Sequence, residues 1–312
     1  MRKLSAFALF SFLLSTSATV EALKVPGFPE IPDSLITINT QISATTETLT
    51  AINLRSGNHN LLGVLHLPTS TMPKEGFPAV ILFHGFRGSK FGIYKRISSA
   101  LAAAGIAVIR FDMAGCGDSE GIPEEIPMHT YLQNGEDIVH AVAKYPEINA
   151  KRIGLAGFSL GCHTTLHLAR FYSPSKFSLR AISLWAPVAD GAILFKEIYK
   201  NINGSVDLAN NFFGKDFGFG SAPLVLCSED VSYFLSLQDH IVLNSLPIKV
   251  PILHLQGLND TLVSLTHQSL FQNTAPGNVC FKSYERTGHS IDGSPHVDTI
   301  IHDIVKHFQS FL

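Results

Sequence analysis

The sequence predicts an α/β protein with a mostly parallel sheet, helices on both faces of the sheet and a cap insertion. Three observations predict it. From residue 78 onward, short apolar runs alternate with helix-compatible segments, which is typical of parallel strands joined by right-handed crossovers. A glycine-flanked turn at 157–161 joins one such strand to one such helix. A stretch rich in aromatic residues and glycine, at about 187–250, interrupts the alternation.

Residues 1–22 are predicted to form a secretory signal peptide. Arg2 and Lys3 precede an apolar run, 4–14, and small residues follow as far as Ala22, the order of a charged region, a hydrophobic region and a cleavage site. The run is shorter than the roughly 20 residues of a spanning helix. We expect cleavage after Ala18 or Ala22, no stable membrane anchor afterwards, and a secreted or periplasmic protein.

The composition of the 312-residue chain restricts the kinds of partner that it is expected to bind. It is 46% hydrophobic and 15% charged, with a net charge of −2 and no Lys/Arg run beyond the first residues. Nucleic acid is therefore not an expected partner, since binding it requires a concentrated basic face. No His/Asp cluster has the spacing of metal ligands, so neither a metal nor a cofactor is predicted. The oligomeric state stays open.

Four cysteines, Cys116, Cys162, Cys227 and Cys280, allow three disulfide pairings and match no zinc motif. Export permits disulfides without requiring them. Cys162 follows the glycine-flanked turn, and Cys280 lies in an apolar strand. Both are expected to be small core residues.

The elements before the alternation predict an antiparallel edge. After an N-terminal extension, 23–44, the main domain is expected to span 45–312. Two β-rich segments, 48–54 and 61–67, flank turn residues and predict a hairpin. Residues 78–83 form a continuous apolar run, the pattern of a strand buried on both faces.

The alternation then continues to the end of the chain. Helices are predicted at 94–104, 130–145, 162–172, 266–274 and 297–311, and strands at 106–111, 152–156, 179–185, 251–256 and 279–284.

The interruption at 187–250 is too long for an ordinary loop in a compact domain. We interpret it as a cap over the carboxyl ends of the strands, where ligands bind in such sheets. The alternative is a small second domain with no part in binding.

Ser159, in Gly157-Phe158-Ser159-Leu160-Gly161, is the predicted nucleophile. The strand, tight turn and helix around it are the context in which G-x-S-x-G presents a serine. Side chains at Gly157 and Gly161 would collide with the neighbouring strand and helix. The amide of Leu160 is then predicted to face a developing oxyanion.

His289 and Asp260 are the predicted partners of this serine. A serine alcohol needs a base within reach, and the imidazole needs a third group to hold its tautomer. Each of the two directly follows a predicted strand, and the chain order Ser, Asp, His is the expected one for this arrangement.

Competing histidines and aspartates have simpler explanations. His140, His254, His302 and His307 lie inside predicted helices or strands, where solvated or core roles are expected. Asp112 and Asp118 flank a glycine-rich turn, and Asx-turn hydrogen bonds explain them. Asp292 is too close to His289 in sequence to orient it.

The second oxyanion donor is predicted in His84-Gly85-Phe86, which follows the buried strand. Gly85 lets the backbone approach the site, and the amide of Phe86 is the expected donor opposite that of Leu160. His84 is expected to orient the loop.

These motifs, together with 110–121 (R-F-D-M-A-G-C-G-D-S-E-G), resemble the α/β-hydrolase superfamily over nearly the whole chain from about residue 45. Within it, they most resemble bacterial feruloyl or cinnamoyl esterases, which hydrolyse esters of hydroxycinnamic acids and hold the aromatic acyl group with the cap. Phe158 departs from that pattern, because His is frequent at the position before the nucleophile. The export signal is a second departure from it.

The sequence therefore predicts a secreted, cofactor-independent serine hydrolase that cleaves carboxylic esters of small molecules through an acyl-enzyme. An apolar or aromatic, hydroxycinnamoyl-like acyl group is expected from the aromatic residues of the cap. A monoacylglycerol lipase, a peptidase or an acyltransferase on the same scaffold is the alternative. A non-catalytic binding protein of this fold is disfavoured because all three residues of the triad are present.

Overall fold

The structure, a computed structural model, describes residues 36–43, 46–172, 177–201, 212–213, 224–225, 228–247 and 249–312. All of them belong to the unit Asp33–Leu312. The signal peptide predicted at 1–22 and most of the extension predicted at 23–44 lie outside the described residues. Parts of the predicted cap, 202–211, 214–223, 226–227 and 248, do so too.

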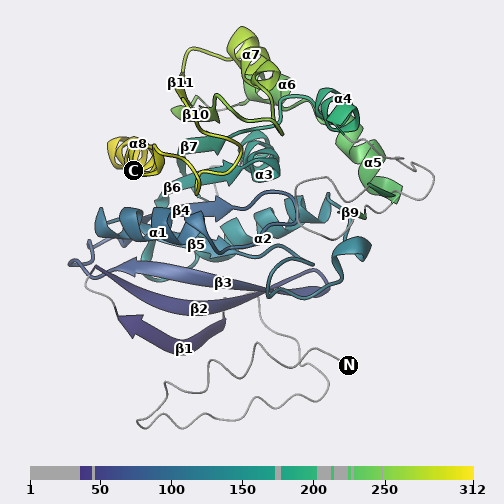
Figure 1. The fold of residues 1–312 in the computed structure, drawn as a ribbon. Helices are drawn as coiled ribbons and strands as arrows, with labels where there is room; N and C mark the ends of the chain where they lie inside the picture. Colours follow the sequence, from purple (N-terminus) through teal and green to yellow (C-terminus); the bar gives the residue numbers. More distant parts are fainter. Residues whose placement is uncertain are drawn as a thin grey trace. The chain divides into compact units, whose positions relative to one another are not determined.

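A nine-stranded sheet forms the centre of this unit (Figure 1). Its six parallel strands confirm the predicted class, and the antiparallel strands lie together at one edge. In spatial order the strands are β1 (Ile36–Ser43), β2 (Glu47–Ser56), β3 (His59–Pro68), β5 (Ala107–Phe111), β4 (Phe77–Phe83), β6 (Ile148–Phe158), β7 (Leu179–Trp185), β10 (Ile252–Gly257) and β11 (Val279–Tyr284).

Helices cover both faces of the sheet (Figure 1). One face packs against α1 (Ile93–Ala103) and α8 (Val297–Phe311). The other packs against α2 (Thr130–Ala143), α3 (Leu160–Arg170) and α7 (Leu265–Thr274). Along the chain, the segment from β7 to β10 contains α4 (Gly191–Asn201), α5 (Ser228–Leu235), α6 (Asp239–Asn244) and the short strands β8 (Phe212–Phe213) and β9 (Leu224–Val225). A 3-10 turn, Pro123–Glu125, precedes α2.

The central strand β4 shows why its sequence is apolar throughout. Every residue of β4 is buried. Ile81 and Phe83 join the core beneath α2 and α3, whereas Val80 and Leu82 join the core beneath α1 and α8. Because side chains alternate between the faces and both faces are covered, no position in this strand can be polar without a buried partner.

The predicted hairpin is β2 and β3, and it extends further than expected. Pairing continues to Ser56 and His59, so the turn holds two residues, with Gly57 at φ 53°. That φ is the left-handed conformation that two-residue hairpin turns require. The predicted strands stop at 54 and begin again at 61, whereas Arg55 and Asn60 still pair in the structure.

The prediction that Cys280 is a core residue is wrong. Cys280 is exposed because β11 is the last strand of the sheet and its neighbours lie on one side only. Cys162 is fully buried on α3, as expected. Cys116 is buried too, with its Sγ 2.9 Å from the hydroxyl of Tyr131. These three are free thiols, and Cys227 lies outside the described residues.

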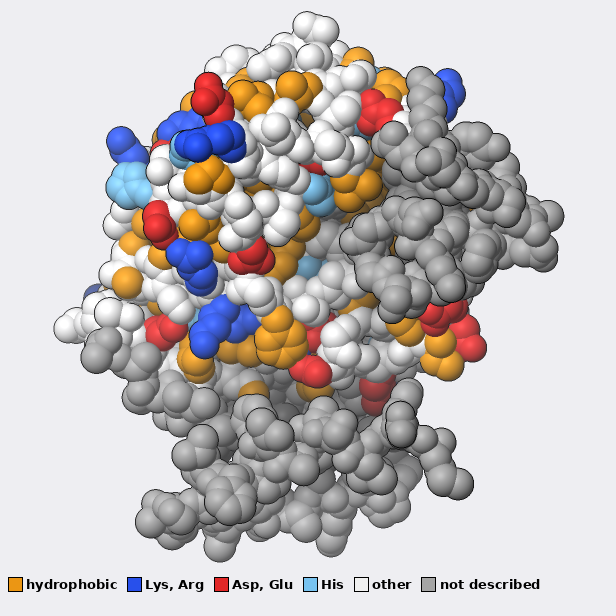
Figure 2. All heavy atoms as spheres, in the orientation of Figure 1, with side chains coloured by type: hydrophobic (Ala, Val, Ile, Leu, Met, Phe, Trp, Pro, Cys, Tyr) orange, Lys and Arg blue, Asp and Glu red, His pale blue; other side chains and the backbone are white. Residues whose placement is uncertain are grey.

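Charges of both signs are distributed over the surface. On the face in Figure 2, Lys and Arg side chains lie near Asp and Glu side chains, with hydrophobic ones between them. None of the helices that the structure describes has the length and apolar character needed to span a membrane. Across the same ranges, no three His, Cys, Asp or Glu side chains are grouped as metal ligands.

His254 is a buried polar residue in β10. Its ring is fully buried against Phe271 and Phe281, with centroid distances of 5.3 and 4.9 Å. Neither ring nitrogen has a partner on another described residue. Burial lowers the pKa of His254 to about 3. The folded protein therefore holds this imidazole neutral under conditions in which the unfolded chain protonates it.

This difference predicts a loss of stability in acid. Between pH 6.5 and 3 the unfolded state binds one proton more at His254 than the folded state, so the free energy of unfolding falls as pH falls, by about 3 kcal/mol from pH 7 to pH 4. His254→Leu should flatten this slope in urea titrations at each pH. His302→Leu, on the exposed part of α8, is the control and should keep the slope. An unchanged slope in His254→Leu would contradict the account.

Candidate active site

Ser159 lies on the sharp turn between β6 and α3. Its φ and ψ are 52° and −120°, a conformation that costs a non-glycine residue energy and is maintained only by its surroundings. The amide of Ser159 donates to the carbonyl of Trp185 at 2.8 Å, which attaches the turn to β7. The following residue, Leu160, begins α3, so the positive end of the helix dipole faces the serine.

The two glycines of the motif lie where a side chain has no room. A Cβ on Gly161 would approach the carbonyl oxygen of Phe83 in β4 to 2.2 Å. A Cβ on Gly157 would approach the Gly161 carbonyl oxygen, at the start of α3, to 2.4 Å. Backbone atoms cannot move aside as a flexible side chain can. As the sequence predicted, a side chain at either glycine would therefore collide with the neighbouring strand or helix.

The structure brings His289 and Asp260 into direct contact. His289 Nδ1 is 2.8 Å from Asp260 Oδ2, and the side chain of Asp260 is fully buried. Each residue follows a strand: Asp260 comes after β10 and His289 after β11. The pair fixes the tautomer, because Nδ1 carries the proton donated to the carboxylate and Nε2 is left as an acceptor.

The remaining capacity of the Asp260 carboxylate is also used. Oδ1 accepts the amides of Leu262 and Val263, both at 2.9 Å. Oδ2 accepts Nε2 of Gln256 at 3.1 Å in addition to His289. A buried carboxylate with four donors is held both in charge and in orientation.

Ser159 and His289 are brought to the same end of the sheet but are not hydrogen-bonded to each other. Among the described residues, no hydrogen bond joins Ser159 Oγ to the imidazole. Their backbones are linked through one residue, because Trp185 accepts the Ser159 amide and its indole N–H donates to the carbonyl of His289 at 2.8 Å. The ring of Phe158 packs against the His289 ring at 5.0 Å between centroids. Bonds between nucleophile and base are often loose without substrate and tighten when it binds.

The loop after β4 lies against the Ser159 turn. A Cβ on Gly85 would be 3.0 Å from the Phe158 ring and 3.2 Å from Ser159 Cβ, so the loop approaches closely because residue 85 is glycine. The next residue, Phe86, supplies the amide predicted as the second oxyanion donor. This amide and that of Leu160 thus come from segments that flank the serine.

His84 holds this loop in place. The amide of Met113 donates to His84 Nε2 at 3.0 Å, so Nδ1 carries the proton and donates to the carbonyl of Gly85 at 2.7 Å. Burial lowers the pKa of His84, which keeps the ring neutral, as this pattern requires. With the Gly85 carbonyl bound to His84, the peptide that carries the Phe86 amide is fixed in orientation.

A buried ion pair that the sequence did not predict supports the same loop. Asp112 is fully buried and accepts both the amide and the Nζ of Lys90, each at 2.5 Å. It also accepts the amide of Asp118, six residues further along the chain, at 2.8 Å, which is a longer connection than the Asx turn expected from the sequence. The pair ties the loop after β4 to the turn after β5. Removing either partner would leave an uncompensated buried charge.

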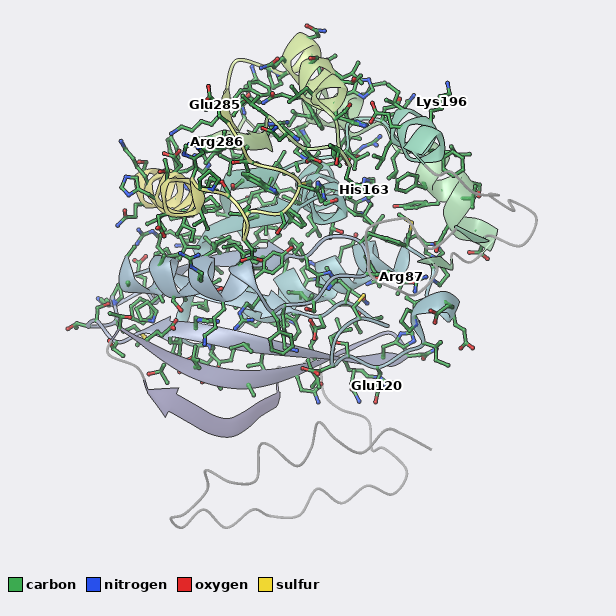
Figure 3. All side chains as sticks on the ribbon, in the orientation of Figure 1. Arg87, Glu120, His163, Lys196, Glu285 and Arg286 are labelled. Carbon is green, nitrogen blue, oxygen red and sulfur yellow. The ribbon has the colours of Figure 1, made fainter. Side chains whose placement is uncertain are left out.

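A second buried network joins α3 to two helices of the predicted cap, α5 and α6. His163 lies one turn after Ser159 on α3 (Figure 3). Its Nδ1 is 2.7 Å from Asp239 Oδ1 of α6, and its Nε2 is 2.8 Å from the hydroxyl of Tyr233 of α5. Burial alone would lower the pKa of His163, but the charge and hydrogen bond of Asp239 outweigh it and raise the pKa. Helices α5 and α6 are therefore attached to α3, the helix that follows Ser159.

Two further contacts attach helices in the described part of the predicted cap. Asp230 of α5 accepts the amide of Met128 at 2.7 Å. Glu197 of α4 accepts the hydroxyl of Ser264 at 2.6 Å and lies 3.4 Å from Nε2 of the buried His267. The sequence signalled neither these pairs nor the His163 network, because the partners are far apart along the chain. Of the aromatic residues that suggested a cap, Phe217 and Phe219 lie outside the described residues.

Comparison with known proteins agrees with this architecture. A family model described as serine aminopeptidase, S33, matches residues 75–209. The structure of Est1E from Butyrivibrio proteoclasticus with ferulic acid bound superposes with a TM-score of 0.66 at 19% identity, covering 81% of this chain and 96% of that one. The structural likeness confirms the predicted α/β-hydrolase fold.

Curated relatives are similar over shorter segments. Thiohydrolase aneE of Aspergillus aculeatus is 30% identical over 95 residues, which is 30% of each chain. Esterase FrsA of Escherichia fergusonii is 26% identical over 132 residues, 42% of this chain and 30% of that one. The matches thus span about 30% of the length of these relatives.

Proposed function

We propose that the protein is a serine hydrolase that cleaves carboxylic esters through an acyl-enzyme, with Ser159, His289 and Asp260 as its triad. The observation that carries this is the His289–Asp260 pair, which leaves Nε2 as a proton acceptor at the end of the sheet where Ser159 is held on a strained turn. A hydroxyl, a correctly oriented base and a buried carboxylate are the groups that acyl transfer requires.

The proposed reaction has two steps. Ser159 Oγ attacks the acyl carbon while His289 Nε2 takes its proton, and the amides of Phe86 and Leu160 stabilise the oxyanion. Collapse of the resulting tetrahedral intermediate breaks the ester bond, and His289 returns the proton to the departing alcohol. Water, deprotonated by His289, then attacks the acyl carbon, and His289 gives this proton to Ser159 Oγ as the bond to the acyl group breaks, which releases the acid and free Ser159. Asp260 stays ionised and offsets the charge of the imidazolium.

An apolar or aromatic acyl group is the proposed substrate class. The aromatic composition of the cap and the likeness of the fold to Est1E, whose structure contains ferulic acid, support it. Tyr233 contributes an aromatic ring next to His163 on the cap side of α3, with their ring centroids 5.8 Å apart. Aromatic side chains with few polar groups are typical of pockets for such ligands.

A second candidate activity is the removal of N-terminal residues from peptides. The description of the family model that matches residues 75–209, serine aminopeptidase, favours it. The same triad could cleave an amide, with His289 protonating the amine that leaves. Thioester hydrolysis is a related candidate with the same acyl-enzyme chemistry, which the similarity to thiohydrolase aneE suggests.

A hydrolysis panel on the mature protein separates these activities. The substrates are p-nitrophenyl esters of rising chain length, a monoacylglycerol, methyl ferulate, an acyl thioester and aminoacyl p-nitroanilides, with Ser159→Ala as the blank. We expect ester cleavage, with methyl ferulate preferred over alkyl esters. Preference for short or medium chains would overturn the acyl assignment and leave the triad. Cleavage of the anilides alone would replace the esterase proposal by the aminopeptidase.

Export of the protein is a separate proposal, supported by the charged, apolar and small-residue order of 1–22. Expression of the full chain in a bacterial host with a functional secretion system should yield a product that begins at Thr19 or Leu23. Intact-mass measurement of the product checks this. A product that retains residues 1–22 would contradict the proposal.

A further inference from the structure

The chain contains one tryptophan, and it lies at the candidate site. Trp185 is the last residue of β7 and is 3% exposed. It pairs with Phe158 of β6 on one side and with Leu255 of β10 on the other. The next residue, Ala186, has φ 47°. The chain therefore turns sharply directly after Trp185, between the strand that carries Ser159 and the strand that leads to Asp260.

The backbone of Trp185 holds the serine turn. Its carbonyl accepts the amide of Ser159 at 2.8 Å. This bond continues the β6–β7 pairing by one residue, into the turn itself. Because it involves only backbone atoms of residue 185, it survives any substitution of the side chain.

The indole of Trp185 holds the histidine loop. Its Nε1 donates to the carbonyl of His289 at 2.8 Å. Of the backbone N–H and C=O groups of residues 288–290, this carbonyl alone has a hydrogen bond among the described contacts. The indole ring itself is packed against Tyr284 at a centroid distance of 6.1 Å, so the donor has a fixed position.

We propose that Trp185 is a positioning residue that sets the separation between Ser159 and His289, an inference that rests on the proposed function. Asp260 fixes the tautomer and one end of the imidazole, whereas the indole fixes the backbone to which the imidazole is attached. A single side chain and its own carbonyl thus connect the nucleophile with the base. Reaction rates are sensitive to displacements of about 1 Å in such pairs.

Room for displacement exists beside the loop. A small apolar cavity lies between α1 and α8, and Phe158, Trp185 and Ile291 are among its lining residues. Ile291 lies two residues after His289 in the sequence, and the ring of Phe158 packs against the His289 ring. Without the indole N–H, the carbonyl of His289 would lose its partner and the loop could shift toward this cavity or toward solvent.

Because the chain has a single tryptophan, the indole N–H can be replaced at residue 185 without changing any other residue. Expression in a tryptophan auxotroph supplied with 3-benzothienylalanine would exchange the indole N–H for sulfur at residue 185 alone, with ring size preserved. We expect kcat on the preferred ester to fall by about tenfold or more with KM within about twofold, since substrate binding does not involve this bond. The rate of phosphonylation of Ser159 by a p-nitrophenyl phosphonate should fall by a similar factor.

Two comparisons keep the test sharp. Tyr284→Phe removes a hydrogen bond of similar length from the same cluster, that of its hydroxyl to Asp303 at 2.7 Å, without touching His289, and should leave kcat unchanged. Trp185→Phe, a genetically encoded variant without the donor, should reproduce the loss. Circular dichroism and thermal unfolding establish that each protein is folded.

The outcomes separate this inference from the proposed function. Full activity of the benzothienyl protein, with Ser159→Ala inactive, would overturn the role of Trp185 and leave the triad. An equal loss in Tyr284→Phe would overturn it too, because the effect would then be general loosening. Turnover retained in Ser159→Ala would instead refute the triad.

Discussion

Ser159→Ala is expected to lower kcat for a cleaved ester by about 10⁴-fold or more, because no covalent intermediate can form without Oγ. The fold should be retained. The amide of residue 159 still donates to Trp185, and alanine meets the same backbone strain as serine at φ 52°. Steady-state kinetics with a thermal unfolding curve for each protein measures both effects.

The matched control for this variant is Ser290→Ala. Ser290 follows His289 directly and is exposed, so the substitution removes a hydroxyl from the neighbourhood of the site without touching the proposed nucleophile. Its kcat should stay within about twofold of the original. Turnover by Ser159→Ala above that of a mock purification would exclude Ser159 as the nucleophile.

Asp260→Asn is expected to lower kcat by about 10³- to 10⁴-fold, the size of effect known for the corresponding change in another serine hydrolase. The amides of Leu262 and Val263 require an oxygen at the Oδ1 position. The new amide nitrogen must then occupy the Oδ2 position and donate toward His289 Nδ1. The imidazole would carry its proton on Nε2 and could not accept one from Ser159.

Gln256 adds a further cost to the new amide in Asp260→Asn. The Gln256 Nε2 donates both to Asp260 Oδ2 and to the carbonyl of Val263, so the variant places two donors against each other. Asp292→Asn is the control, because Asp292 is an exposed carboxylate in the same loop as His289. Kinetics over a range of pH compares the two. A larger effect of Asp292→Asn would reverse the assignment of the orienting acid.

Most of the fold could be predicted from local sequence. Continuous apolar runs such as that of β4 arise because both faces of the strand are buried, and the positions of Gly157 and Gly161 follow from collisions that any such turn would have. Cys280 shows the limit. An apolar run does not reveal whether its strand is central or last in the sheet, and β11 is last.

The parts of the site that the sequence did not predict share one property: they depend on contacts between distant residues. Lys90 and Asp112 are separated by 22 residues, and His163 and Asp239 by 76. Trp185 and His289 are separated by 104. Each of these pairs joins two elements or loops that strand order makes neighbours. A lone lysine, histidine or tryptophan carries no local pattern that indicates its partner.

The measurement that tests the central claim most directly is covalent labelling of the mature protein with a fluorophosphonate, followed by intact-mass and peptide mass spectrometry. We predict one phosphonyl group per chain, on Ser159, with labelling lost in Ser159→Ala and strongly slowed in His289→Ala, because the alcohol reacts only when a base removes its proton. Labelling at another residue, or unreactive protein that is folded and otherwise active on the preferred ester, would contradict the assignment of Ser159, His289 and Asp260 as the catalytic triad.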